Sequence, residues 1–188
     1  MVKNKLRKSL FEQGQSLSDS FITDSNLIIQ SQAIEKIDFK SIINILLYFP
    51  YRYEVSIELI EKEINKYSNN IYMPRIFSNK NMSFNLLDGS PLVKNKYGIN
   101  EINNNKYLDP LSFDCMFIPF VGIDSKGKRL GYGGGYFDRS LEVLKGSKEK
   151  PLIVGLGYDY QVSEETYGEK HDLKYDLVIT ERRVLSFI

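Results

Sequence analysis

Three short apolar segments in the second half of the chain constrain its fold most strongly. They comprise residues 114–119, 152–156 and 176–179, and turn-forming residues border each of them. Apart from Asp114 and Asp176, which begin two of the segments, their residues are apolar or small, and such short apolar segments are typical of strands covered on both faces. Helices between such strands indicate βαβ units. We therefore expect an α/β fold with three layers, α/β/α, built on a mostly parallel open sheet.

The first third of the chain is expected to be largely helical. Residues 3–13 predict a short basic helix, and apolar residues at helical spacing predict helices over residues 26–37 and 56–67. Ser25 is the expected N-cap of the second helix. This distribution supplies the helices that the two faces of a parallel sheet require.

Further strands are expected before residue 114. Compact apolar runs predict strands over residues 42–49 and 71–73, the second of which ends before Pro74. Residues 79–107 are rich in Asn, Lys and Gly and predict loops with one or two edge strands. No internal repeat or long linker interrupts residues 1–188, so we expect a single domain.

A glycine-rich loop lies between an expected strand and an expected helix. Gly131, Gly133, Gly134 and Gly135 fall within five positions. Without side chains they let the backbone approach a ligand closely and direct several N–H groups toward it. The positive end of the following helix adds to this potential. We expect the loop to bind phosphate.

Charged residues flank the glycine loop. Arg129 and Arg139 offer guanidinium groups that suit two-point phosphate contacts, and Asp138 offers a carboxylate that suits Mg²⁺. These features together indicate a nucleotide–metal site. The segment matches neither of two common phosphate-binding motifs. Arg129 follows Gly127-Lys128 where a Walker loop needs Ser or Thr, and Tyr136 stands where a Rossmann fingerprint needs glycine. A glycine-rich corner that binds nothing remains the alternative interpretation.

Charge and cysteine content exclude several classes of protein. The chain has 25 Lys and Arg against 24 Asp and Glu, a net charge of +1, and so lacks the basic field of a non-specific nucleic-acid binder. Cys115 is the only cysteine, which excludes an intrachain disulfide and indicates a reducing compartment. No run approaches the ~18 to 20 apolar residues of a membrane span, and no secretory signal is present. We expect a cytoplasmic protein without nucleic-acid or membrane partners.

The glycine loop is one of several segments that match the sequence motifs of a known protein family. The match is strong at residues 114–124, 127, 129–131, 133–138, 168–172 and 176–181. The match to these family motifs is weaker at residues 3–7, 48–61, 73–75 and 97–101. Ile102 stands where the motif that includes residues 97–101 has proline. In these segments the chain resembles the 5-formyltetrahydrofolate cyclo-ligase family, also called 5,10-methenyltetrahydrofolate synthetases.

The resemblance implies a fold, a reaction and a set of substrates. The fold would be the isomerase/CoA-transferase-like α/β sheet of that family. The reaction would be the ATP-dependent conversion of 5-formyltetrahydrofolate to 5,10-methenyltetrahydrofolate with release of ADP and phosphate, in folate and one-carbon metabolism. ATP and Mg²⁺ would be required, and we expect the enzyme to act as a monomer.

The resemblance also implies roles for individual residues. Phe49 and Glu54 match folate-binding positions, Asp138 and Asp172 match two magnesium carboxylates, and Arg129 matches a catalytic position. The matched ATP contacts are Lys3, Arg7, Arg129, Leu130, Gly131, Tyr132, Gly133, Gly134, Gly135, Tyr136 and Phe137. One departure is that the family commonly has a second tyrosine where this chain has Phe137.

Other interpretations remain open from the sequence. Lys3 and Arg7 alone fit a solvated basic helix face, Glu54 a surface ion pair with Arg52, and Phe49 a core position. A phosphosugar isomerase or a CoA-transferase-like enzyme would also use a glycine loop on a similar sheet. A nucleotide- or folate-binding protein without turnover would keep such a site as well.

Overall fold

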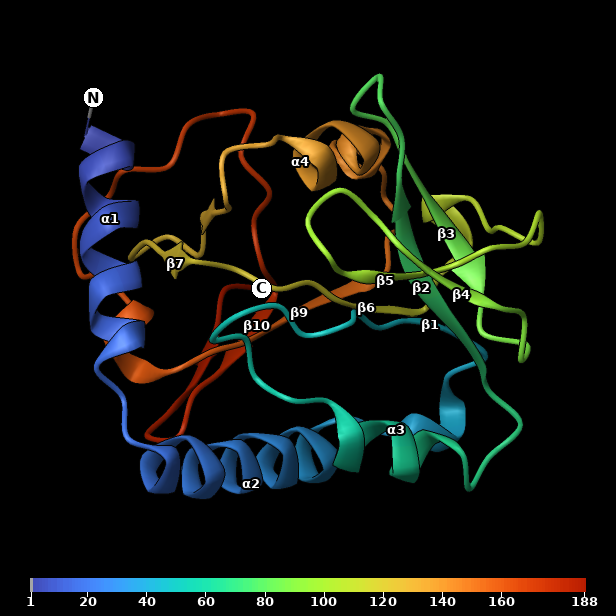
Figure 1. Ribbon diagram of the computed structural model, residues 1–188, viewed down its shortest axis with the longest axis horizontal. Coiled ribbons are helices and arrows are strands. Elements are labelled where there is room, and N and C mark those ends of the chain that lie inside the picture. Colours follow the sequence, from blue (N-terminus) through green and yellow to red (C-terminus); the bar gives the residue numbers. More distant parts are fainter. Residues whose placement is uncertain (1) are drawn as a thin grey trace.

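The protein is built on a seven-stranded sheet, seen in a computed structural model that describes residues 2–188 (Figure 1). The strands are β1 (Asn44–Leu46), β2 (Asn70–Ile76), β3 (Met82–Leu86), β6 (Cys115–Phe117), β9 (Leu152–Leu156), β10 (Leu177–Ile179) and β11 (Val184–Ser186). Their order is β11-β10-β9-β6-β1-β2-β3. The five inner strands are parallel and the two edge strands antiparallel to their neighbours. The expected mostly parallel sheet is confirmed.

Helices cover both faces of this sheet. On one face lie α2 (Asp19–Lys36) and α3 (Glu58–Ile64), which bury Ile29, Ala33 and Ile60 against the strands. On the other face lie α4 (Tyr136–Ser140) and the short 3-10 helix η3 (Glu142–Leu144). The helix α1 (Val2–Gln15) stands beyond the carboxyl ends of the parallel strands (Figure 1). The three-layer architecture is therefore confirmed, with α1 outside the layers.

Several expected boundaries were wrong. The helix expected from residue 26 begins seven residues earlier, because the Ser18 side chain accepts a hydrogen bond from the Phe21 N–H and caps it, while Ser25 is buried within α2. Strand β2 continues through Pro74. Strand β1 pairs with β2 only as far as Tyr72, so no parallel partner requires an N–H at position 74.

The connections between strands also differ from the expectation. Only a 3-10 helix, η4 (Asp159–Gln161), and loops join β9 to β10, so this crossover lacks the expected α-helix. Residues 79–107 contain more strand than expected, since β3 is followed by a separate hairpin of β4 (Leu92–Lys94) and β5 (Asn100–Ile102). A second hairpin, β7 (Gly122–Ile123) and β8 (Arg129–Leu130), precedes the glycine loop. Both hairpins lie outside the main sheet.

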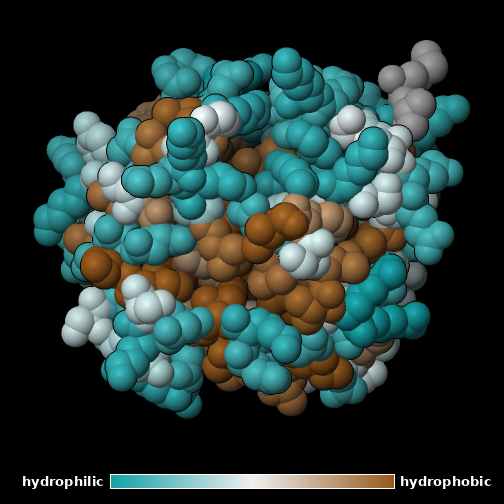
Figure 2. All heavy atoms as spheres, turned by 180° about the vertical axis from the view of Figure 1, so that it is seen from behind, coloured by the Kyte–Doolittle hydropathy of each residue, from teal (hydrophilic) through white to brown (hydrophobic). Residues whose placement is uncertain are grey.

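The rear surface is polar over most of its area, with apolar residues in a band across its middle (Figure 2). The largest apolar side chains are nevertheless buried in two clusters, one on each face of the sheet. Within residues 2–188, no helix is both long enough and apolar enough to pass through a membrane.

Candidate active site

A cleft of about 790 Å³ opens between α1, the glycine loop and the turns that follow β1 and β2. This volume is typical of small-molecule sites. The cleft lies beyond the carboxyl ends of the strands, where open parallel sheets usually bind ligands. Every candidate residue from the sequence lines it: Lys3, Arg7, Phe49, Glu54, Arg129, Leu130, Gly131, Tyr132, Gly133, Gly134, Gly135, Tyr136, Phe137, Asp138 and Asp172.

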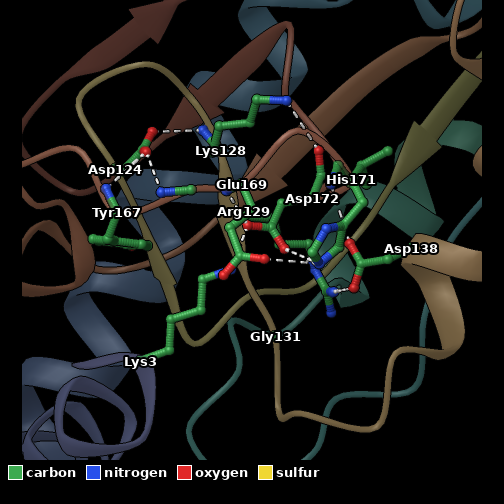
Figure 3. Close-up of polar contacts among 12 residues, drawn as sticks. Lys3, Asp124, Lys128, Arg129, Gly131, Asp138, Tyr167, Glu169, His171 and Asp172 are labelled. Carbon is green, nitrogen blue, oxygen red and sulfur yellow. Dashed lines mark hydrogen bonds and ion pairs between the residues drawn. The ribbon is translucent and has the colours of Figure 1, made fainter. Parts of the chain in front are cut away.

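Arg129 is fixed in the floor of the cleft. Its side chain is 6% exposed, and its Nε donates a hydrogen bond of 2.8 Å to the Pro119 carbonyl. Its guanidinium lies over the Phe137 ring, 5.1 Å from the centroid, and Nη1 lies 3.5 Å from Asp138 Oδ2 (Figure 3). A guanidinium held on three sides has little rotamer freedom left to lose when it meets an anion. Phe137, which replaces the family tyrosine, serves here as the apolar floor beneath this cation.

Asp138 and Asp172 approach the same stretch of backbone. Asp138 Oδ1 accepts a hydrogen bond of 3.1 Å from the N–H of Leu173, the residue next to Asp172. Carboxylate oxygens are the donors that Mg²⁺ prefers, and two of them with phosphate and water oxygens complete its octahedron. Within residues 2–188, no cluster of three or more metal-ligating side chains occurs. The donor chemistry therefore fits a magnesium ion that arrives with a phosphate ligand.

Helix α1 contributes two cations to the cleft. Lys3 Nζ lies 2.6 Å from Asp172 Oδ2 and 3.2 Å from Glu169 Oε1 (Figure 3). Burial alone would lower the pKa of Lys3, but the hydrogen bond and charge of Asp172 raise it above its ordinary value. Burial would likewise raise the pKa of Asp172, yet the Glu169 N–H and Lys3 lower it. Both groups are consequently charged at neutral pH.

Arg7 links α1 to the glycine loop, because its Nε donates a hydrogen bond of 2.7 Å to the Gly131 carbonyl. Lys3 and Arg7 therefore point into the cleft rather than forming a solvated basic face. The sequence interpretation as an ordinary surface helix is wrong on this point.

The glycine loop has a backbone that other residues rarely adopt. Gly133 and Gly135 have φ angles of +95° and +69°. Gly131 has a different restriction, since a Cβ atom there would overlap the Arg129 guanidinium. Helix α4 is only five residues long, so the helix end behind the loop contributes less positive potential than the sequence suggested. The loop's own N–H groups and Arg129 remain as the main donors.

Phe49 and Glu54 line the cleft on the side of β1. Glu54 Oε2 accepts a hydrogen bond of 2.8 Å from the Tyr51 N–H. Burial raises the pKa of Glu54 to about 7. Within residues 2–188, Arg52 forms no ion pair with Glu54, and its guanidinium lies over the rings of Phe11 and Tyr51 at 5.4 and 5.1 Å. The alternative of a surface ion pair is therefore wrong.

Sequence reasoning gave no site role to several residues that line the cleft. They include Tyr51, Tyr97, Glu101 and Glu169, whereas Arg139, which the sequence predicted as a phosphate contact, lines the cleft as well. A signal was available, since all four fall in segments that resemble the family. That signal did not assign them to the cleft, because Tyr51, Tyr97 and Glu169 lie in loops whose positions follow only from the folded chain.

Comparison with known proteins gives consistent results. The model of the 5-formyltetrahydrofolate cyclo-ligase family matches residues 1–181. The chain is 31% identical to the 5-formyltetrahydrofolate cyclo-ligase of Haemophilus influenzae, with 93% of this chain and 92% of that protein covered. It is also 31% identical to the Mycoplasma genitalium protein of the same name, with 94% and 96% covered. The NMR structure of Aquifex aeolicus 5,10-methenyltetrahydrofolate synthetase aligns with a TM-score of 0.84 and 27% identity, covering 100% of this chain and 93% of that one.

Proposed function

The chain belongs to the 5-formyltetrahydrofolate cyclo-ligase family, and from this premise we propose that its cleft binds ATP and a folate side by side, with Arg129 between them. The activity is the ATP-dependent conversion of 5-formyltetrahydrofolate to 5,10-methenyltetrahydrofolate. The convergence of the candidate nucleotide, metal and folate residues on one cleft carries this proposal.

The chemistry explains the need for ATP. The N-formyl oxygen is a poor leaving group, so it first attacks the γ-phosphorus and displaces ADP. The neighbouring folate nitrogen then adds to the activated formyl carbon and loses its proton. Expulsion of phosphate leaves the delocalised methenyl cation. Because little covalent chemistry is left to the protein, its work is positioning and charge neutralisation.

Arg129 is suited to stabilise the phosphoryl group during transfer. It is pinned by the Pro119 carbonyl and the Phe137 ring before any substrate arrives. A preorganised donor does not have to reorient as charge develops, and this is where electrostatic catalysis gains most. Its 3.5 Å separation from Asp138 is long for an ion pair, so its donors remain accessible to phosphate.

Lys3, Arg7 and the glycine loop are proposed to hold the nucleotide phosphates. Asp138 and Asp172 would hold Mg²⁺, which when bound neutralises phosphate charge. Lys3 then has a second function, because it keeps Asp172 ionised and positioned while the metal is absent. Substituting Asp138→Asn should raise the Mg²⁺ concentration needed for half-maximal activity, and an unchanged magnesium titration would remove Asp138 from this role.

Phe49 and Glu54 are proposed to bind the folate. With a pKa of about 7, the Glu54 carboxyl accepts hydrogen bonds from pterin N–H groups in its ionised form and donates one in its neutral form. The Phe49 ring supplies apolar surface beside it. The formyl group would thereby face the glycine loop.

The comparisons do not support the alternative enzymes considered from the sequence, a phosphosugar isomerase or a CoA-transferase-like enzyme. The curated relatives are cyclo-ligases, and the aligned structure is a synthetase of the same reaction; none is a phosphosugar isomerase or a CoA transferase. We further propose that residues 1–188 act as one catalytic domain, since α1 and the segment around Asp172 line the same cleft. A cytoplasmic location remains our proposal, which the buried free thiol of Cys115 favours. A monomeric state is also our proposal.

The direct test is product formation by the purified chain. With MgATP and 5-formyltetrahydrofolate, we expect methenyl absorbance and ADP release in equal amounts. ADP release should fall to background when the folate is left out or replaced by a sugar phosphate. ATP binding without methenyl formation would instead indicate a binding protein without turnover.

A further inference from the structure

A buried carboxylate connects the β7–β8 hairpin to the chain segment that leads to Asp172. Asp124 lies in the turn of this hairpin and is 0% exposed. Its Oδ1 accepts hydrogen bonds from the N–H groups of Lys126 and Lys128, at 2.9 and 2.8 Å. Its Oδ2 accepts hydrogen bonds from the N–H groups of Tyr167 and Gly168, at 3.2 and 2.9 Å. One oxygen therefore closes the hairpin turn, and the other holds residues 43 and 44 positions away (Figure 3).

Backbone N–H groups stabilise this carboxylate without the help of a cation. Among the described residues, 2–188, no ion pair includes Asp124. All four hydrogen bonds to its oxygens come from the main chain. A buried carboxylate without a counter-charge depends on each such donor, because the loss of one leaves its charge poorly compensated. The hairpin and the distant segment are therefore held together at this point.

The same hairpin also holds the other end of this segment. Lys128 Nζ donates a hydrogen bond of 3.1 Å to the Asp172 carbonyl (Figure 3). The Arg129 N–H donates one of 2.8 Å to the Leu173 carbonyl. Between these anchors the chain turns, and the Asp172 N–H donates a hydrogen bond of 3.1 Å to the Glu169 carbonyl. The turn that carries the Asp172 side chain is thus fixed before and after by one hairpin, and Arg129 belongs to that hairpin.

Gly168 allows the segment to lie directly against the hairpin. A Cβ atom at this position would overlap Lys128 Cβ and would lie 2.9 Å from Asp124 Oδ2. A side chain here would therefore push the two main chains apart. On its other side the segment packs through Tyr167 against the apolar cluster that contains Leu10 of α1. Contacts on both sides fix where the segment lies.

We propose that Asp124 is a positioning residue for the metal end of the cleft: by holding the backbone of residues 167–168 on the hairpin, it fixes the Asp172 carboxylate relative to Arg129 and Asp138. This inference rests on the proposed function and deepens it. Groups that orient a metal ligand from behind contribute to metal affinity although they never touch the metal. Asp124 accordingly acts on the binding of Mg²⁺ together with its nucleotide, and it leaves the folate contacts unchanged.

The test uses Asp124→Asn, which keeps the shape of the side chain and one acceptor oxygen. The amide places N–H groups where the second oxygen was, so it cannot accept hydrogen bonds from both chain segments. Asp114→Asn is the matched control. Asp114 Oδ2 also accepts hydrogen bonds from the N–H groups of a distant segment, Ile43 and Asn44, both at 2.8 Å. These contacts lie at the amino ends of β1 and β6, across the sheet from the cleft.

The first readout is amide hydrogen exchange of the ligand-free proteins, which does not depend on activity. In Asp124→Asn we expect residues 167–173 to exchange about tenfold faster than in wild type, while β6 and β9 keep their protection. The control should match wild type over residues 167–173. Unchanged exchange in this segment would overturn the proposal. Faster exchange throughout the sheet would do the same, because it would show that Asp124 only supports the fold.

The second readout is calorimetric binding of ADP, with Mg²⁺ and with EDTA in its place. We expect Asp124→Asn to weaken MgADP binding about 10- to 100-fold, and to change the binding of metal-free ADP by no more than about twofold. The Mg²⁺ concentration for half-maximal activity should rise, while KM for the folate stays within about twofold. An unchanged ratio of the two ADP affinities, or an equal rise in KM for the folate, would overturn the proposal.

Gly168→Ala disturbs the same contact without removing the carboxylate, because its Cβ would overlap Lys128. It should show both changes, and it keeps the test decisive if Asp124→Asn does not fold. Normal exchange and normal MgADP binding in a folded Gly168→Ala would contradict the positioning role. Wild-type protein that binds MgADP no more tightly than metal-free ADP, or that shows no turnover, would instead count against the proposed function, so the two failures are distinguishable.

Discussion

The cationic side chains of Arg129 and Lys3 both point into the cleft, but their surroundings differ. Arg129 is buried and fixed by a carbonyl and an aromatic ring, and its own N–H donates to the Leu173 carbonyl. Lys3 stands on α1, which packs through a small cluster around Leu10 and Leu130, and its side chain is paired with two carboxylates. We infer that the first region is rigid and catalytic, and that the second exchanges its partners when the nucleotide binds.

We infer from this difference that Lys3 serves mainly binding and Arg129 mainly chemistry. A group that gives up existing ion pairs to reach phosphate contributes modest affinity in both the ground and the transition state. A group that is fixed in advance contributes most when charge develops. The predictions below follow this contrast.

The largest effect is expected from Arg129→Ala. Removing one preorganised donor typically lowers kcat on the order of a hundred- to a thousandfold. Arg129→Lys should recover only part of the rate, since an ammonium group lacks the planar two-point contact. Steady-state methenyl formation at saturating substrates measures both, with circular dichroism as the check on folding. Near wild-type kcat in a folded alanine variant would remove the proposed role.

Gly131→Ala should displace the same guanidinium without removing it. Its Cβ would overlap Arg129, and displacements of catalytic groups by about 1 Å cost up to about a hundredfold in rate. We expect kcat to fall about 10- to 100-fold. Gly146→Ala is the control, because no atom lies near the Cβ position of Gly146, although its φ of +83° adds a backbone strain that Gly131 does not have. A kcat of Gly131→Ala no lower than that of Gly146→Ala would show that the Arg129 guanidinium is not displaced in a way that matters for the rate.

Glu54→Gln tests whether the ionised carboxylate of the buried Glu54 lowers the stability of the folded protein. Because the folded-state pKa of Glu54 is raised to about 7, the folded protein loses stability as pH rises from about 4.5 through 7. The variant should be more stable than wild type by about 3 kcal/mol at pH 8 and equal to it below pH 4.5, while folate binding weakens. Urea unfolding at the two pH values measures this. A stability difference that does not change with pH would contradict the raised pKa.

The smallest effect is expected from Lys3→Gln. We predict a five- to tenfold rise in KM for ATP with kcat within about twofold, and a smaller rise at high salt. Lys8→Gln is the control on the same helix, since the Lys8 side chain is 80% exposed and pairs with Glu12 on the helix surface. A kcat defect larger than the KM defect would place Lys3 in the catalytic region.

Local patterns predicted the sheet and the glycine loop but not the contacts around them. Residues 115–119, which follow Asp114, are apolar because β6 is buried on both faces, and this pattern is visible in the sequence. The pairing of Lys3 with Asp172 joins residues 169 positions apart, and no spacing rule reports it. The start of α2 was misplaced because Ser18 and Ser25 are equally good caps on residue type, and only packing decides between them.

The most direct test of the contrast is a single-turnover experiment at saturating MgATP and 5-formyltetrahydrofolate, with wild type, Arg129→Ala and Lys3→Gln compared side by side. Saturation removes differences in binding, so the rate of methenyl formation reports the chemical steps alone. We predict a rate about a hundredfold or more below wild type for Arg129→Ala and within about threefold of wild type for Lys3→Gln. Equal slowing in the two variants, or a slower Lys3→Gln, would contradict the division of the cleft into a rigid catalytic region and an exchanging binding region.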